Sequence, residues 1–174
     1  MYDVLMVRDD PPGAFNPSLF PILSDPTIDL RFAHDATEAF YRLQKEPDLI
    51  IFDLDLPPGR NHEIQVIDNR LGKPGIQSIF SEKESHRLLG CYLLPLWLNV
   101  INNYPSLDIS FDALRLQHPL NINRILVYSV AADACRPDLK KLGLADIQII
   151  TPRIAMDRFF LHRLIKNTLQ KNDR

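Results

Sequence analysis

The stretch PDLIIFDLDLPPG, residues 47–59, decides the fold of this 174-residue chain. Its apolar run, Leu49 to Phe52, leads into Asp53 and Asp55, and prolines and a glycine then close it. A short apolar run closed by turn residues is typical of a buried central strand in a parallel sheet. Acidic residues at the carboxyl end of such a strand lie where open α/β sheets bind their ligands. The stretch therefore predicts a central strand with a functional site at its end.

Strands and helices are predicted to alternate on both sides of this strand. Strands are expected at residues 3–7, 27–33, 49–53, 124–129 and 147–150. Helices are expected at residues 18–23, 36–45, 63–71, 81–102, 137–142 and 155–170. The alternation predicts one α/β domain over residues 1–174, a doubly wound sheet of five parallel strands with helices on both faces.

A long, mainly helical insert, residues 60–123, separates the third predicted strand from the fourth. Within it, residues 81–102 are broadly apolar, and we expect Gly90 and Pro95 to kink or split their helix. The apolar side chains around Trp97 are interpreted as core, with a dimer or partner surface as the alternative.

The composition is that of an ordinary globular protein, with 45% hydrophobic and 24% charged residues. A formal net charge of -2 without a basic stripe argues against nucleic acid as the main partner. The longest apolar run, residues 88–98, is too short to cross a bilayer. Without a secretory signal, Cys91 and Cys135 are interpreted as reduced thiols of a cytoplasmic protein. The scattered histidines lack metal-ligand spacing and are interpreted as surface or structural residues.

Polar residues follow three of the predicted strands at the point where each strand ends. They are Asp9 after the first strand, Asp53 and Asp55 after the third, and Ser129 after the fourth. Because the carboxyl ends of neighbouring parallel strands meet in one crevice, we expect these side chains to lie close together. Carboxylate oxygens suit Mg²⁺, and beside such a cation the Asp53 carboxylate is able to attack a phosphoryl group.

Each of these residues also has a plain structural interpretation. Asp53 is able to act as a turn former or helix cap, and Asp55 as a turn residue. Asp10, the neighbour of Asp9, is able to cap the turn that follows. Ser129 is able to satisfy backbone groups at the strand end. Their expected convergence at one edge of the sheet favours the functional interpretation.

The motifs resemble the receiver domain of response regulators in two-component signalling. MVRDD resembles the end of that family's first strand with its acid pair, and FDLDLPPG resembles the phosphoacceptor strand and its turn. LVYSV resembles the fourth strand with its switch hydroxyl. The resemblance covers residues 1–52 and 124–170, and it implies a flavodoxin-like sheet with strand order 2-1-3-4-5.

The resemblance implies a role for each residue of the site. Asp53 is then the phosphoacceptor, and Ser129 is the hydroxyl that turns toward the phosphoryl group. Mg²⁺ is then held by Asp9 and Asp53, with Asp55 contributing its backbone carbonyl. Self-phosphorylation from a phosphodonor and self-dephosphorylation are the only reactions that the resemblance implies, so the chain is not otherwise expected to be an enzyme.

The resemblance also implies a cytoplasmic, phosphorylation-dependent switch for protein interaction. Its expected partners are a histidine kinase or phosphotransfer protein and a downstream effector protein. The last two helices and the insert are the surfaces expected to contact a partner or to form a homodimer. Neither nucleic acid nor a membrane is an expected partner.

The chain departs from the family's pattern at four positions. One is Val130, the residue after the switch hydroxyl, where the family prefers a smaller side chain. Arg8 replaces the first acid of the pair, and Gln148 replaces the switch aromatic of the last strand. Thr151 stands where the family has a lysine that pairs with the phosphoryl oxygens. We hypothesise that Arg8 supplies the positive charge that this lysine would have given.

Two other functions fit part of the sequence. A pseudo-receiver, which keeps the fold as a binding module without phosphorylation, is favoured by the departures at Arg8, Gln148 and Thr151. The haloacid-dehalogenase-like phosphohydrolases carry an Asp-x-Asp motif on a strand, to which IIFDLDL is similar. In that family Asp53 would be the nucleophile and Asp55 the acid/base, but the second acid pair is missing from residues 147–151.

Overall fold

The structure is a computed structural model, and it describes residues 1–9, 19–71, 88–101, 111–151, 157 and 159–172. Five parallel strands form one sheet in the order β2-β1-β3-β4-β5, with the strand of the opening stretch in the middle. The strands are β1 (Tyr2–Val7), β2 (Ile28–Ala33), β3 (Leu49–Phe52), β4 (Ile125–Tyr128) and β5 (Gln148–Ile150). The predicted flavodoxin-like α/β fold is confirmed.

The described part of the chain also contains six α-helices and two short 3-10 helices, all of which lie between strands except α6, which follows β5. The α-helices are α1 (Phe20–Leu23), α2 (Ala36–Leu43), α3 (His62–Arg70), α4 (Leu89–Trp97), α5 (Ala132–Lys141) and α6 (Phe160–Asn172). The 3-10 helices are η3 (Asp112–Leu114) and η4 (Ile122–Arg124). Within the described ranges, no helix combines the length and the apolar character that crossing a bilayer requires.

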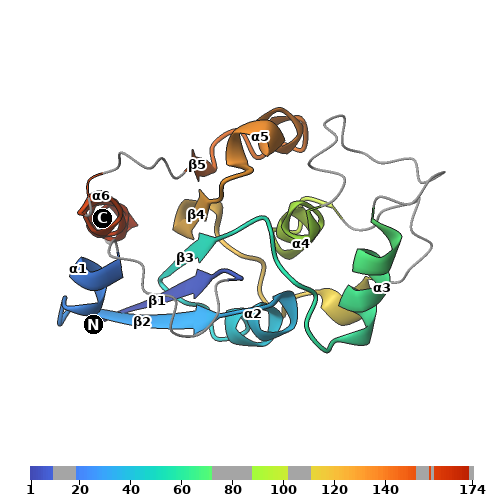
Figure 1. Ribbon diagram of the computed structural model, residues 1–174, viewed down its shortest axis with the longest axis horizontal. Helices are drawn as coiled ribbons and strands as arrows, with labels where there is room; N and C mark the ends of the chain where they lie inside the picture. The colour runs from blue at the N-terminus through green and yellow to red at the C-terminus, as the bar shows by residue number, and fades with distance from the viewer. Residues whose placement is uncertain (10–18, 72–87, 102–110, 152–156, 158, 173–174) are drawn as a thin grey trace.

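Helices cover both faces of the sheet, as Figure 1 shows. Helices α1 and α6 pack on one face, where they meet the side chains of Val4 and Met6 from β1. Helices α2, α4 and α5 pack on the other face, where they meet Leu5 and Val7. The alternation of side chains along β1 thus supplies both cores, as expected for a strand that is buried on two sides.

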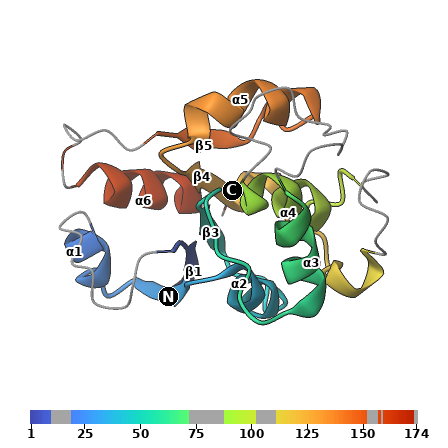
Figure 2. The same cartoon turned by 45° about the vertical axis from the view of Figure 1, so that its right-hand side comes forward.

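Helix α4 is the central helix of its face. It lies between α2 and α5, and α3 lies on its outer side (Figures 1 and 2). All nine of its residues are buried. The ring of Trp97 lies 5.9 Å from the ring of Phe52 on β3 and 6.3 Å from the ring of Phe40 on α2. The interpretation of these apolar side chains as core is confirmed.

The largest differences from the expected helix extents are at α4, α5 and α6. Of the expected helix 81–102, residues 89–97 form α4, and residues 81–87 and 102 lie outside the described residues. Pro95 lies inside α4 and does not divide it, because burial on all sides outweighs one lost backbone hydrogen bond. The last helix, expected at 155–170, is observed as α6, and residues 155, 156 and 158 lie outside the described residues.

Helix α5 was expected to begin at Pro137, and this prediction is wrong. The helix begins at Ala132, whose amide donates a hydrogen bond to the carbonyl of Ser129 at 3.1 Å. The chain therefore turns into the helix directly after β4, and Pro137 falls inside it.

Candidate functional site

Asp53 lies at the carboxyl end of β3, between the ends of β1 and β4. Its amide donates a hydrogen bond to the carbonyl of Val7 at 2.9 Å, which extends the pairing of β1 with β3 by one step. Its carboxylate oxygen Oδ1 accepts a hydrogen bond from the amide of Asp55 at 3.1 Å. The sheet and the following turn therefore hold the partly buried Asp53 carboxylate at the edge where the resemblance predicts the site.

Ser129 brings a hydroxyl from the end of β4 to Asp53. Its side chain is fully buried and hydrogen-bonds the Asp53 carboxylate. Its amide donates to the carbonyl of Ile150 on β5 at 3.2 Å, and its Oγ accepts from the amide of Ala131 at 3.3 Å. Because an ionised carboxylate only accepts hydrogen bonds, the Ser129 hydroxyl is the donor to Asp53.

The charged groups that act on Asp53 are the carboxylates of Asp9 and Asp55. Burial is the largest cause that raises the pKa of the Asp53 carboxyl, and the negative charges of Asp9 and Asp55 raise it further. The hydrogen bonds from Ser129 and from the Asp55 amide lower this pKa and only partly offset the increase. Among the described residues, no basic side chain forms an ion pair with Asp53. A carboxyl group perturbed in this way at a strand end is typical of a functional site.

The predicted metal ligands lie close enough to affect one another but do not form a closed cage. Asp9 and Asp55 are exposed, and their charges reach Asp53. Within the described ranges, no group of three or more Asp, Glu, His or Cys side chains is placed to hold a metal ion. Mg²⁺ is usually bound by only one or two carboxylates, because it keeps several of its waters. The carboxylate oxygens and the negative charge of Asp9, Asp53 and Asp55 are therefore of the chemical type that binds Mg²⁺.

Neither Arg8 nor Thr151 takes the place of the family's lysine in the observed contacts. Arg8 Nη1 lies 3.9 Å from the sulfur of Met6. Burial raises the pKa of Tyr128, and the positive charge of Arg8 partly offsets that increase, so Arg8 acts on Tyr128. The Oγ1 atom of Thr151 is buried and has no hydrogen-bond partner among the described residues. The hypothesis that Arg8 compensates for the lysine stays a prediction.

The loop after Asp55 is anchored to the start of α2. The hydroxyl of Thr37 donates to the carbonyl of Pro58 at 2.7 Å and accepts from the amide of Asn61 at 2.8 Å. Gly59 has a φ of +74° in this loop, and a Cβ there would lie 2.4 Å from Oδ1 of Asp35. Only glycine fits both the conformation and the space, so the loop that begins at Asp53 is held at its far end as well.

Cys91 and Cys135 form a buried pair of free thiols between α4 and α5. Their mutual hydrogen bond is the largest cause that raises the pKa of Cys91 well above its ordinary value, and burial adds to the effect. Thiols with raised pKa values are poor nucleophiles. The pair therefore acts as a packing contact, in agreement with the interpretation of both residues as reduced thiols.

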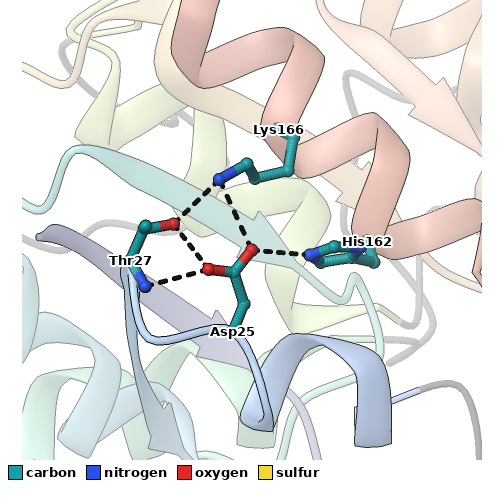
Figure 3. Close-up of polar contacts among 4 residues, drawn as sticks. All are labelled: Asp25, Thr27, His162 and Lys166. Carbon is teal, nitrogen blue, oxygen red and sulfur yellow. Dashed lines mark hydrogen bonds and ion pairs between the residues drawn. The ribbon is translucent and has the colours of Figure 1, made fainter.

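Figure 3 shows a second polar cluster, which joins the turn before β2 to α6. Because this turn precedes a strand whereas Asp53 follows one, the cluster lies at the opposite end of the parallel sheet. Asp25, in the turn before β2, accepts hydrogen bonds from the amide and the hydroxyl of Thr27 at 2.9 and 2.6 Å. From α6, His162 Nε2 and Lys166 Nζ lie 2.8 and 3.4 Å from Oδ2 of Asp25. The bond from the Thr27 hydroxyl, followed by that from His162, holds the pKa of Asp25 well below its usual range. Sequence reasoning missed this cluster, because no local spacing relates Asp25 to α6.

The predicted residues Asp9, Asp53, Asp55 and Ser129 thus meet at one edge of the sheet, and Asp10 lies outside the described residues. A scan against protein-family models and a search of curated proteins gave no match for this chain. The interpretation of the site therefore depends on its fold and geometry.

Proposed function

We propose that this chain is a receiver-like signalling module that is phosphorylated on Asp53. In this proposal Mg²⁺ is held by Asp9, Asp53 and the backbone carbonyl of Asp55. One observation carries the proposal: in a sheet of order 2-1-3-4-5, the carboxylate that ends the central strand is hydrogen-bonded by Ser129 and flanked by two further acids.

The chemistry of the proposed step needs an ionised carboxylate with an oxygen that is able to attack. The Asp53 carboxylate has more acceptor sites than the hydrogen bonds from Ser129 and Asp55 use. An Asp53 oxygen forms a bond to phosphorus, and the bond from phosphorus to the donor's leaving group breaks, so that this group departs with the electron pair. The Ser129 hydroxyl is then able to donate its proton to an oxygen of the new phosphoryl group. Mg²⁺, when bound, supplies positive charge that neutralises the phosphoryl oxygens.

The proposed output is a change in the surface near α5. The carbonyl of Ser129 accepts the amide of Ala132 at the start of α5, so a movement of Ser129 toward a phosphoryl group is transmitted to that helix. The proposed partners are a histidine kinase or phosphotransfer protein and a downstream effector protein. The last two helices and the insert are the proposed contact surfaces for a partner or a homodimer, and the proposed compartment is the cytoplasm.

A pseudo-receiver is the second candidate, and a specific observation favours it. Thr151 stands at the position of the family's lysine, and its buried hydroxyl has no hydrogen-bond partner in the part of the chain that the structure describes. Without a cation at this position, the negative charge of a phosphoryl group on Asp53 is less well neutralised.

Beryllofluoride with Mg²⁺ distinguishes the two candidates, because it mimics a phosphoryl group on an aspartate. We expect wild-type protein to bind it, with a higher melting temperature and NMR shift changes at Ser129 and α5. At a ligand concentration of 100 Kd the stabilisation would be about 2.7 kcal/mol. Asp53→Asn should show no response, and Asp25→Asn should respond like wild type. A wild-type protein without an Asp53-dependent response would favour the pseudo-receiver.

A further inference from the structure

The first turn of α4 lies directly against the backbone that follows Asp53. The amide of Gly90 donates a hydrogen bond to the carbonyl of Leu54 at 3.0 Å. Leu54 is fully buried and stands between Asp53 and Asp55. The insert therefore holds the peptide next to the proposed acceptor, although 36 positions separate Leu54 from Gly90 in the sequence (90 − 54).

Glycine at position 90 is required by space. A Cβ there would lie 2.7 Å from both Cα and the carbonyl oxygen of Leu54, and 3.0 Å from the carbonyl oxygen of Asp53. All three are backbone atoms, so rotation of a side chain cannot relieve the contact. The φ of Gly90 lies outside the left-handed region that favours glycine. The requirement thus comes from the close approach of α4 to the strand end.

The next residue of α4 joins the same turn to the other half of the site. Cys91 hydrogen-bonds Cys135 of α5, and α5 begins at the carbonyl of Ser129. The first turn of α4 therefore contacts both the strand end that carries Asp53 and the helix that follows Ser129.

We propose that Gly90 is a positioning residue for Asp53, and that its amide and its missing side chain let α4 set the conformation of the peptide after Asp53. The inference rests on Asp53 as the functional group of the proposed site. A side chain at position 90 would force α4 and this peptide apart. This separation would change the conformation of the peptide after Asp53 and, with it, the position of the Asp53 side chain.

Backbone NMR shifts and amide hydrogen exchange next to Asp53 test this inference in wild type, Gly90→Ala and Gly143→Ala. Gly143 is the matched control, because it has a φ of +80° and a Cβ there would meet nothing within 4 Å. Alanine at 143 therefore strains the backbone without touching the site. We expect Gly90→Ala to shift the amide resonances of Asp53, Leu54 and Asp55 and to speed their hydrogen exchange, and Gly143→Ala to leave both unchanged. Unchanged resonances and exchange rates in Gly90→Ala would overturn the inference.

A second measurement needs no variant at position 90 and serves if Gly90→Ala does not fold. Asp53→Asn in an otherwise wild-type chain should move the amide resonance of Gly90, because that amide is hydrogen-bonded to the residue after Asp53, and should leave the resonance of Gly143 in place. A Gly90 amide that does not respond to Asp53→Asn would overturn the inference. Neither readout requires phosphorylation, so a failure of the beryllofluoride test and a failure of this inference are distinguishable.

Discussion

Asp25 and Asp53 are carboxylates at opposite ends of one sheet, and their surroundings are electrostatic opposites. Asp25 accepts hydrogen bonds from Thr27, and its Oδ2 lies 3.4 Å from Nζ of Lys166. The pKa of Asp25 is lowered. Asp53 is partly buried beside two further acids, and its pKa is raised. A neutralised carboxylate stabilises the fold, whereas one surrounded by acids carries charge that a bound cation is able to neutralise. The comparison therefore separates a structural cluster from a candidate functional site.

The largest expected effect is that one asparagine variant loses phosphorylation and the other loses stability. Asp53→Asn should abolish phosphorylation and keep or slightly increase the free energy of unfolding, because it removes a buried charge next to other acids. Asp25→Asn should leave phosphorylation intact and lower the free energy of unfolding by about 1–3 kcal/mol, since charge-assisted hydrogen bonds are lost. Mass spectrometry and urea denaturation measure the two quantities. Equal losses of stability in both variants would remove the distinction.

The pH dependence of stability should have opposite signs at the two sites. The pKa of Asp25 is lower in the folded than in the unfolded protein, so its contribution is complete above about pH 4 and is lost as the pH falls. The pKa of Asp53 is higher in the folded protein, so stability falls as the pH rises from about 4 through that pKa. Relative to wild type, urea denaturation across acidic pH should show Asp25→Asn losing stability with rising pH and Asp53→Asn gaining it. Parallel curves for the two variants would contradict this assignment.

A positively charged side chain introduced at position 151 should give Asp53 a neighbouring cation, as Lys166 does for Asp25. By the family resemblance, the ammonium group of Thr151→Lys would face Asp53, lower the pKa of that carboxyl and increase the yield of phosphorylation. NMR titration and intact-mass measurement report the two effects. Thr151→Met is the control, because it adds length without charge. If the lysine and methionine variants behave alike, position 151 does not act on Asp53.

The smallest expected effect concerns the hydroxyl of Thr151. Thr151→Val removes a buried polar atom that has no partner in the described part of the chain and keeps the shape of the side chain. The free energy of unfolding should change by less than about 1 kcal/mol, in favour of valine, as measured by urea denaturation. A larger loss would reveal an interaction of this hydroxyl that stabilises the fold.

The five strands and the site at their carboxyl ends could be predicted because their signals are local. Apolar runs such as Leu49 to Phe52 mark buried strands, and the residue after each run marks the edge of the sheet. The position of α4 could not be predicted in this way, because the contacts of Trp97 with Phe40 and Phe52 join distant parts of the chain. From its residue type alone, Gly90 predicts a kink in the helix. In the structure, glycine is needed there because α4 lies close to the backbone of Leu54.

The proposal for Asp53 is tested most directly by the mass of the intact protein after incubation with Mg²⁺ and a small phosphodonor. The wild-type protein should gain one phosphoryl group, located on the peptide that contains Asp53. Asp25→Asn should gain the same group, and Asp53→Asn should gain none. An unchanged wild-type mass, or an equal gain in Asp53→Asn, would contradict the proposal.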